Sequence, residues 1–392
     1  MELRSLGDRT DLMVLPADAF VPRRERTPGR LSFVPPPGRG SCTFACTRDE
    51  VGLGHGFRRL RRPCQGEWIV QKTMLGRCFE AGRLTLGGGG IGQVWGSTDR
   101  DEAIATVRAA HEAGIDLFDL APLYGRGEAE RVMGLAFADG YPEDVKVTTK
   151  CMLGDAPTDE IESRLSGSLD ESCARLGRDR VDVFILHGYL IQDGWADSIR
   201  PKLLPHIGVQ HSRFASHVVP LFERWRAEGR IGAWGITAAS TQDQNLGALD
   251  AETKPDVVQC IANLLDSPGG MAISDEKPQP RSVIERASEL GVGVMGIRAI
   301  AAGALAGRID RPVPSDSAEQ RDFERAAGFR ALAAETERSP AFLAHQYALS
   351  MPGVDTVVLG VKNREELSEC LAAEAAGPMD PSLMKAIDRA VA

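Results

Sequence analysis

Four ionisable side chains follow three successive apolar runs of the sequence. The runs span residues 115–120, 145–150 and 181–187, and they carry in this order Asp119 with Tyr124 five positions later, Lys150, and His187. Short apolar runs bounded by glycine, proline or polar residues are typical of buried strands. If these strands are parallel neighbours, their carboxyl ends bring all four side chains to one edge of a sheet. The spacing therefore predicts a site built from a carboxylate, a phenol, an ammonium and an imidazole.

Together these four groups could supply a proton to an alkoxide as it forms. A phenol is a weak acid because its ordinary pKa is about 10, and a nearby ammonium lowers that pKa by stabilising the phenolate. Tyr124 would then donate the proton, Lys150 would lower its pKa, and Asp119 would hold Lys150 in place. His187 would position a carbonyl oxygen beside the phenol through a hydrogen bond. No side chain can supply the hydride that creates the alkoxide, so this chemistry implies a nicotinamide cofactor.

Three of the four residues also have an ordinary structural interpretation. A single aspartate after a strand is usually a turn or capping residue, and a single lysine is usually a solvated end. A single histidine usually fills a structural position. Their joint position at consecutive strand ends is what favours a functional site.

Strand and helix patterns alternate along the chain from residue 83 onward. Strands are predicted near 84–86 and over 115–120, 145–150, 181–187, 231–237, 257–262, 292–298 and 356–361. Helices are predicted after Thr98 and over 127–138, 158–176, 218–229, 241–250, 281–290, 318–349 and 364–375. Such alternation over roughly 250 residues predicts the α/β class and a (β/α)8 TIM barrel, with a doubly wound sheet as the alternative. A barrel places its active site at the carboxyl ends of its strands, where the four residues lie.

The first 72 residues differ from the remainder. They are rich in arginine, include the proline run Pro35–Pro37 and lack a sustained apolar period. We expect residues 1–72 to be an irregular N-terminal extension, either disordered or produced by a start site assigned too far upstream, and residues 73–392 to form the barrel. A zinc site is disfavoured because the spacing fits no familiar finger for Cys42, Cys46, His55 and Cys64.

Composition narrows the functional class. The formal net charge of −9 disfavours binding to nucleic acid or to an anionic membrane surface, and no apolar run approaches the roughly 18 residues of a membrane span. The eight scattered cysteines suggest reduced thiols, so we expect a cytoplasmic protein. We expect a monomer or small homo-oligomer that acts on a small molecule. No metal is expected, because helical metal-ligand spacing is lacking among His206, His211 and His217.

The run Gly87–Gly92 (GGGGIG) formally satisfies the dinucleotide-binding pattern G-x-G-x-x-G. In that pattern a helix begins within the glycines, whereas Gln93–Gly96 intervene here before the next helix. A four-glycine run also meets the pattern easily by chance. A tight turn that lets the backbone approach a bulky group is therefore favoured over a Rossmann turn.

The stretch GIDLFDLAPLYGRGEAERVMG, which contains Asp119 and Tyr124, resembles the aldo-keto reductases when it is taken with Lys150 and His187. These four residues look like the catalytic tetrad of that family, and the likeness extends from about residue 73 to the C-terminus. The opening QKTMLGRCFEAGRLTLGGGGIG is similar to how bacterial members begin. The resemblance implies a (β/α)8 barrel and NAD(P)(H) bound without a Rossmann fold. It also implies reversible reduction of an aldehyde or ketone, including a sugar, to an alcohol.

The resemblance carries over part of the family's cofactor positions. With the glycine turn at Gly89, the candidate cofactor-binding residues are Thr237, Gln259, Arg298, Lys362, Arg364 and Glu369. Gln259 matches the glutamine that bonds the nicotinamide carboxamide, and Arg298 could contact pyrophosphate. Lys362 and Arg364 are candidate ligands of a 2′-phosphate, which favours NADP(H) over NAD(H).

Several positions depart from the family pattern. Ala238 stands where asparagine is usual, Ile297 replaces the aromatic residue that stacks on nicotinamide, and Cys370 replaces an asparagine beside Glu369. Glu366 falls where many NADP-dependent members have arginine, which keeps NAD(H) open as the cofactor.

Two other functions stay open. The residues that depart from the family pattern suit a barrel that binds the cofactor with negligible turnover. Such a barrel would sense redox state or regulate a partner, and it would resemble the channel-associated members of the family. A different barrel enzyme would need a glycine-rich phosphate site, for which Gly303 and Gly307 are weak candidates.

Two segments are expected to flank the mouth of the barrel. Residues 188–217 are long for a strand-to-helix connection and contain Tyr189, Trp195 and three histidines, so we expect substrate contacts there. Residues 264–278 would form the opposite wall.

Overall fold

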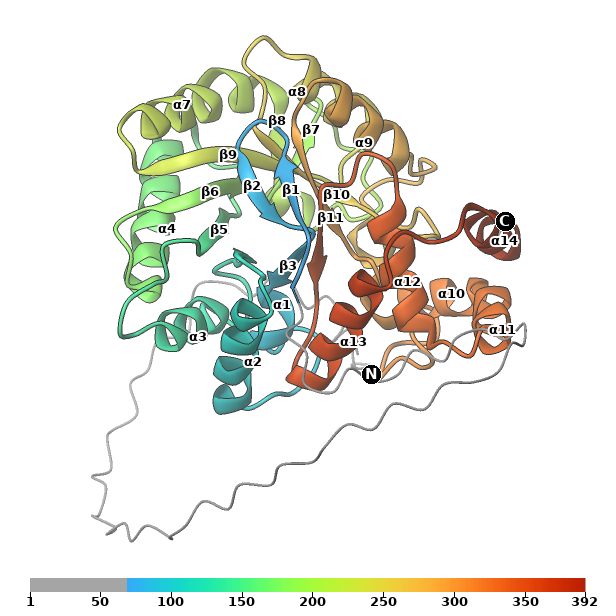
Figure 1. Cartoon of the computed structure of the whole chain (residues 1–392). Coiled ribbons are helices and arrows are strands. Elements are labelled where there is room, and N and C mark those ends of the chain that lie inside the picture. The colour runs from blue at the N-terminus through green and yellow to red at the C-terminus, as the bar shows by residue number, and fades with distance from the viewer. Residues whose placement is uncertain (1–68, 392) are drawn as a thin grey trace, which may run out of the picture. The chain divides into compact units, whose positions relative to one another are not determined.

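The computed structural model of the chain describes residues 69–391. Eight parallel strands close into a barrel (Figure 1). In order around the barrel they are β3 (Leu84–Gly87), β4 (Leu117–Asp119), β5 (Lys146–Cys151), β6 (Val181–Leu186), β9 (Ile231–Ala238), β10 (Val257–Ile261), β11 (Gly293–Ile297) and β12 (Thr356–Leu359). Since β12 pairs with β3, the barrel has no free edge. The predicted (β/α)8 barrel is confirmed.

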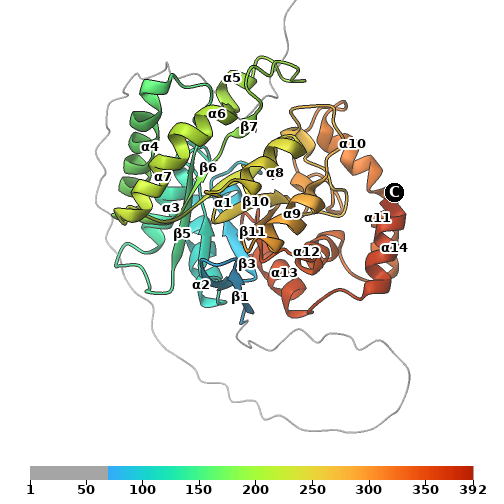
Figure 2. The ribbon, with the colours of Figure 1, turned by 90° about the horizontal axis from the view of Figure 1, so that it is seen from above.

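Helices form a layer outside the strands, as the view from above shows (Figure 2). They are α1 (Gly88–Ile91), α2 (Arg100–Glu112), α3 (Glu128–Ala136), α4 (Ile161–Leu176), α5 (Leu204–Ile207), α6 (His211–Arg213), α7 (Val219–Ala227), α8 (Gln242–Asp250), α9 (Pro280–Glu289), α10 (Ala318–Arg325), α11 (Ala327–Glu335), α12 (Pro340–Ser350), α13 (Arg364–Ala375) and α14 (Pro381–Val391). Single turns of 3₁₀- or π-helix are η1 (Thr158–Glu160), η2 (Phe214–Val218), η3 (Gly269–Met271) and η4 (Ala301–Gly303). Among the described residues, no helix is both long and apolar enough to cross a membrane.

The helical layer differs from the sequence prediction in three respects. Helices α1, α5, α6 and α14 were not predicted. Asp99 rather than Thr98 caps α2, because its carboxylate accepts a hydrogen bond from the backbone N–H of Glu102. The helix predicted over 318–349 is three helices, α10, α11 and α12. The last break has local causes, since Glu337 has a positive φ of 54° and Ser339 caps α12.

An antiparallel hairpin precedes the barrel and was not predicted. It consists of β1 (Lys72–Leu75) and β2 (Phe79–Gly82). Leu75 and Ala81 belong to the apolar cluster inside the barrel, together with Leu117 and Met295 from the strands. The hairpin therefore closes the end of the barrel where the strands begin.

The predicted extension, residues 1–72, lies outside the described residues except for positions 69–72. The candidate zinc ligands between Cys42 and Cys64 are also outside them. Within 69–72, Val70 is buried and its N–H donates to the carbonyl oxygen of Ala113, 3.1 Å away. The packed structure is thus already present at Val70.

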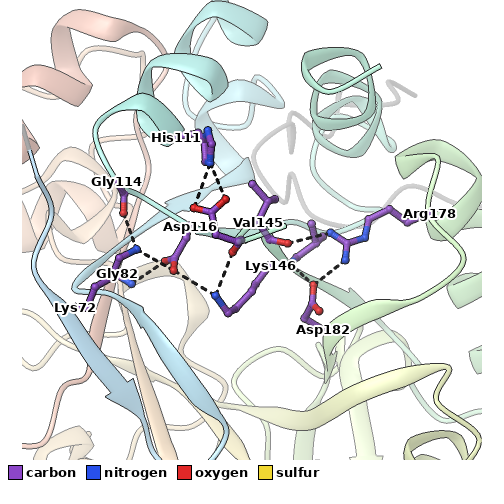
Figure 3. Close-up of polar contacts among 11 residues, drawn as sticks. Lys72, Gly82, His111, Gly114, Asp116, Val145, Lys146, Arg178 and Asp182 are labelled. Carbon is purple, nitrogen blue, oxygen red and sulfur yellow. Dashed lines mark hydrogen bonds and ion pairs between the residues drawn. The ribbon is translucent and has the colours of Figure 1, made fainter. Parts of the chain in front are cut away.

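Asp116 fastens the hairpin to the barrel (Figure 3). Its buried carboxylate accepts a hydrogen bond from the N–H of Gly82 at 2.8 Å. The same group pairs with Lys72 at 2.8 Å and with Lys146 at the start of β5 at 3.3 Å. Gly82 and Lys72 lie in the hairpin and Lys146 lies in β5. The carboxylate of Asp116, the residue before β4, therefore joins the hairpin to β5.

Replacing Asp116 with alanine should lower the free energy of unfolding by about 2–4 kcal/mol, because one buried N–H loses its acceptor and two ammonium groups lose a carboxylate partner. Urea unfolding followed by circular dichroism measures this change. The control is Asp144→Asn, whose carboxylate is 59% exposed and contacts His111; it should change stability by less than about 0.5 kcal/mol. Equal losses in the two variants would contradict the role given to Asp116.

Candidate active site

Lys150 lies at the centre of the candidate site and is fully buried. Its ammonium donates to Asp119 Oδ2 at 2.8 Å, to the carbonyl oxygen of Leu120 at 2.9 Å and to Tyr124 Oη at 3.2 Å. An ammonium has three donor hydrogens, so these acceptors use all of them. The other oxygen of Asp119 accepts a hydrogen bond from Gln259 Nε2 at 2.7 Å.

Strand register explains why these groups meet. Asp119 is the last residue of β4 and lies opposite Thr148 of β5. Side chains two residues apart in a strand point to the same face, so Lys150 follows Thr148 on the inner face and reaches the end of β4. A turn in which the N–H of Tyr124 donates to the carbonyl oxygen of Ala121 then brings Tyr124 back over Lys150.

His187 follows β6 on the other side of Lys150. Its N–H donates to the carbonyl oxygen of Cys151 at 2.8 Å, which fixes it beside the end of β5. Its ring meets the Tyr124 ring edge to face, with 5.8 Å between centroids. Its Nδ1 atom is buried without a hydrogen-bond partner. The four residues predicted from strand ends thus lie in one contiguous group, and their catalytic roles stay predictions.

Burial and the ion pair set the protonation of this group. Burial lowers the pKa of Lys150, but Asp119 and Tyr124 outweigh burial, and the net shift of its pKa is upward. Lys150 is therefore an ammonium at neutral pH. Burial lowers the pKa of His187 to about 3, and the charge of Lys150 adds to that effect. His187 is therefore a neutral imidazole.

The pKa of Tyr124 moves in the direction opposite to the sequence expectation. Burial raises the pKa of Tyr124 above its ordinary value, and the Lys150 ammonium offsets only part of that increase. The ammonium alone would lower the pKa of Tyr124, but the loss of water around the phenol raises it by more. The result is a phenol that holds its proton at neutral pH, which is the form that donates one.

Two further predicted residues lie next to each other beside this group. Thr237 of β9 and Gln259 of β10 are opposite each other in the strand register, and both are buried. The hydroxyl of Thr237 has no hydrogen-bond partner. A free hydroxyl next to a side-chain amide fits the carboxamide of a nicotinamide, which needs both a donor and an acceptor.

Arg298 follows β11 in a left-handed conformation, with a φ of 60°. Its side chain is 8% exposed and lies against Gly269 of η3, with Nη2 3.5 Å from Glu319 of α10. The Nε and Nη2 groups have no hydrogen-bond partner. This arginine is a buried cation with spare donors, which fits an anion.

The remaining predicted cofactor residues are occupied by contacts within the chain. Lys362 pairs with Asp310 and with Glu366, the latter at 2.9 Å. Arg364 pairs with Glu102 of α2 at 2.8 Å, and Glu369 accepts a hydrogen bond from Ser339. Both candidate cations for a 2′-phosphate are therefore already paired with carboxylates.

The glycine run forms a compact turn rather than a Rossmann motif. Gly89 lies in the four-residue helix α1, and a Cβ atom there would come within 2.5 Å of the Trp95 indole nitrogen. The bulky group that this backbone approaches is thus the Trp95 side chain.

The two segments expected beside the mouth contact each other. In the first, β7 (Tyr189–Ile191) pairs with β8 (Gly208–Gln210), and Ser198 donates to the carbonyl oxygen of Ile273 in the second at 2.8 Å. Tyr189 packs with Ile273 in one apolar cluster. Among the described residues, no group of three or more His, Cys, Asp or Glu side chains is arranged to hold a metal ion.

Comparison with known proteins agrees with this geometry. The sequence model of the Aldo/keto reductase family matches residues 83–392. The chain belongs to the aldo/keto reductase family. This family consists of oxidoreductases that use nicotinamide cofactors.

Individual relatives are distant. L-galactose dehydrogenase of Arabidopsis thaliana is 28% identical over 291 residues, which cover 74% of this chain and 82% of that protein. The probable voltage-gated potassium channel subunit beta of Oryza sativa subsp. japonica is 26% identical over 297 residues, covering 69% and 81%. The glycerol dehydrogenase structure from Gluconobacter oxydans matches with a TM-score of 0.59 at 20% identity, over 83% of this chain and 96% of that one. This structural likeness supports the aldo/keto reductase barrel.

Two contacts of this aldo/keto reductase site were missed by sequence reasoning. The Leu120 carbonyl acceptor is a backbone atom and leaves no signal in side-chain type. The hydrogen bond from Gln259 to Asp119 joins residues 140 positions apart. The alternation of β5 could also have shown that the side chain of Thr149 faces the helices, because Lys150, the next residue, faces the inside of the barrel.

His187 should stay neutral from about pH 5 to pH 8, whereas a free histidine side chain titrates near 6.5. The reason is its pKa of about 3, set by burial and by the Lys150 charge. NMR of the histidine ring in ¹³C-labelled protein, assigned with His187→Gln, would show constant shifts over this range. A midpoint above about pH 5 would contradict the environment described for this residue.

Proposed function

We propose that the chain reversibly reduces an aldehyde or ketone to an alcohol with NAD(P)(H), and that Tyr124 donates the proton. The main support for this proposal is the buried Lys150 ammonium, which contacts both the Tyr124 phenol and the Asp119 carboxylate. The name of the Arabidopsis relative, L-galactose dehydrogenase, supports a sugar as one class of substrate.

The nicotinamide cofactor, when bound, supplies the hydride. Gln259 and Thr237 would hold its carboxamide, since they offer an amide and a free hydroxyl side by side. Arg298 would take a cofactor phosphate through its unpartnered N–H groups. Ala238 and Ile297 contribute no polar group, so the orientation of the ring would rest on Gln259 and Thr237.

The chain's own residues perform the proton step. Tyr124 gives its proton to the substrate oxygen, and the resulting phenolate lies 3.2 Å from the Lys150 ammonium, which stabilises it. Asp119 keeps Lys150 charged and directed at the phenol. His187, neutral and beside Tyr124, hydrogen-bonds the substrate oxygen. In the reverse direction the phenolate accepts the proton of the alcohol.

The cofactor preference depends on Lys362 and Arg364. Both cations favour NADP(H), and a 2′-phosphate would bring a charge of about −2 to them. The carboxylates of Glu102, Asp310 and Glu366 compete for the same cations. We therefore propose NADP(H) as the preferred cofactor, with a preference that these carboxylates limit.

The domain organisation, cellular location and oligomeric state complete the proposed function. We propose that residues 73–392 are the domain that carries the activity, and that residues 1–72 are an extension. Free thiols at every described cysteine, Cys78, Cys151, Cys173, Cys260 and Cys370, support a cytoplasmic location. The enzyme would work as a monomer or small homo-oligomer on small carbonyl or sugar substrates.

A regulatory barrel is the second candidate, because one relative is named as a potassium channel subunit. Such a protein would bind NADPH and turn over slowly or not at all. Fluorescence titration with NADPH and NADH, followed by a panel of small aldehydes and sugars, separates the two functions. Tight binding without turnover on the whole panel would favour the regulatory barrel.

Tyr124→Phe should lower kcat by a factor of about 10² to 10⁴, because it removes the phenolic hydroxyl that donates the proton. The aromatic ring beside His187 is retained, so the Kd for NADPH should change less than about twofold. Steady-state kinetics and quenching of tryptophan fluorescence measure the two quantities. A variant that keeps most of its turnover would refute the proton-donor role.

Glu366→Gln should raise the affinity for NADPH relative to NADH about tenfold, which equals about 1.4 kcal/mol. The change removes a carboxylate that pairs with Lys362 at 2.9 Å. Calorimetric Kd values for both cofactors measure the ratio. The control is Glu365→Gln in the same helical turn, whose side chain is exposed, and its ratio should not change. An unchanged ratio in Glu366→Gln would count against a 2′-phosphate site at Lys362.

A further inference from the structure

Glu130 is a buried carboxylate that the proposed mechanism does not use. It lies in the first turn of α3, and its side chain has no exposed surface. Its Oε1 atom accepts a hydrogen bond from the Thr149 hydroxyl at 2.6 Å, and its Oε2 atom accepts one from Arg175 Nε at 2.6 Å. A buried carboxylate is costly unless both oxygens have such partners. Thr149 and Arg175 therefore supply the two hydrogen bonds that make the burial of Glu130 tolerable.

Thr149 connects Glu130 to the strand that carries Lys150. Adjacent residues of a strand point to opposite faces, so Thr149 faces the helices where Lys150 faces the inside of the barrel. Both residues are fully buried. The hydrogen bond to Glu130 thus holds the outer face of β5 at the position of the catalytic ammonium.

The same first turn of α3 is also joined to Tyr124. The N–H of Ala129, next to Glu130, donates to the carbonyl oxygen of Tyr124 at 3.2 Å. Between them, residues 125–127 have three consecutive positive φ values of 64°, 56° and 83°. Arg126 is the non-glycine residue in this turn, and such a residue rarely adopts a positive φ without support.

Arg175 supports this turn directly. Its side chain crosses Gly127, where an added Cβ atom would lie 2.7 Å from Arg175 Cδ. The guanidinium that binds Glu130 thus also covers the turn that returns Tyr124 to the site. A side chain larger than glycine at position 127 would displace it.

These contacts close a ring of interactions. One path runs from Tyr124 through Ala129 to Glu130, and the other runs from Glu130 through Thr149 to Lys150. The ring closes at the 3.2 Å contact between Lys150 Nζ and Tyr124 Oη. We propose that Glu130 and Thr149, braced by Arg175, are positioning residues that set this distance for proton transfer. The proposal rests on the function proposed above.

Thr149→Val tests the proposal, because valine has nearly the same shape and lacks the hydroxyl. Thr148→Val is the matched control: Thr148 is the neighbouring residue, is equally buried, and its hydroxyl has no hydrogen-bond partner. Thr149→Ser restores a hydroxyl, and Glu130→Gln removes the charge while it keeps an acceptor oxygen. The measurements are kcat and KM against pH, the Kd for NADPH, thermal unfolding, and the Tyr124 pKa from ¹³Cζ-tyrosine NMR assigned with Tyr124→Phe.

Thr149→Val should lower kcat on the order of tenfold, with KM and Kd within about twofold. Its Tyr124 pKa should rise relative to the wild type, because the phenolate loses contact with the ammonium. Glu130→Gln should change kcat and the Tyr124 pKa in the same directions. Thr149→Ser should recover most of the loss in kcat, and Thr148→Val should match the wild type in kcat and pKa.

A purely structural role would give a different result. Thr149→Val would then unfold at a lower temperature with kcat and the Tyr124 pKa unchanged, and that outcome would overturn the proposal. The NMR measurement needs no turnover, so it tests the positioning role separately from the proposed enzyme function. If the wild-type protein showed no turnover while Thr149→Val still shifted the Tyr124 pKa, the enzyme function would be refuted. The positioning role of Thr149 would still stand.

Discussion

The site depends on the placement of one ammonium ion inside a protein barrel. Taking the charge of Lys150 out of water costs several kcal/mol, and this cost is offset only if every donor hydrogen finds an acceptor. The three acceptors come from the end of β4, from the backbone just after it and from the turn beyond. They meet only when β4 and β5 are neighbours in the closed barrel. The same contacts that make the buried charge tolerable also place it against the phenol.

The charge of Lys150 organises groups beyond its direct contacts. It reinforces the neutral state of His187, which burial already favours, so the imidazole can hydrogen-bond an oxygen without adding a second cation. It also fixes Asp119, whose second oxygen accepts from Gln259. Four strand steps separate β4 from β10 in either direction around the barrel, so this hydrogen bond spans the mouth. Gln259, which we propose to hold the cofactor, is thereby tied to the ion pair of Asp119 and Lys150.

The sequence predicted the parts of the fold that local periodicity encodes. Short apolar runs alternating with helical patterns predicted the barrel. The positions at the ends of three of these runs singled out Asp119, Lys150 and His187. Periodicity is silent about contacts across the barrel, such as Gln259 with Asp119, and about backbone acceptors such as Leu120. It also missed the hairpin, because β1 and β2 are four residues each and mix polar with apolar positions. The direction of the Tyr124 pKa shift depends on burial, which requires the packed structure.

The three cations that we propose for cofactor binding differ in how readily they could accept a phosphate. Arg364 pairs with Glu102 but is exposed, and exposed ion pairs contribute only about 0–1 kcal/mol, so exchanging Glu102 for another anion would cost little. Lys362 is less exposed and holds two carboxylates, so its exchange costs more. Arg298 is buried, and its Nε and Nη2 groups form no hydrogen bond, although Nη2 lies 3.5 Å from the Glu319 carboxylate. An anion bound there would therefore replace no hydrogen bond at those groups. In the proposed cofactor complex, a phosphate at Arg298 would displace no hydrogen bond, whereas a 2′-phosphate at Lys362 would compete with two carboxylates that already pair with it.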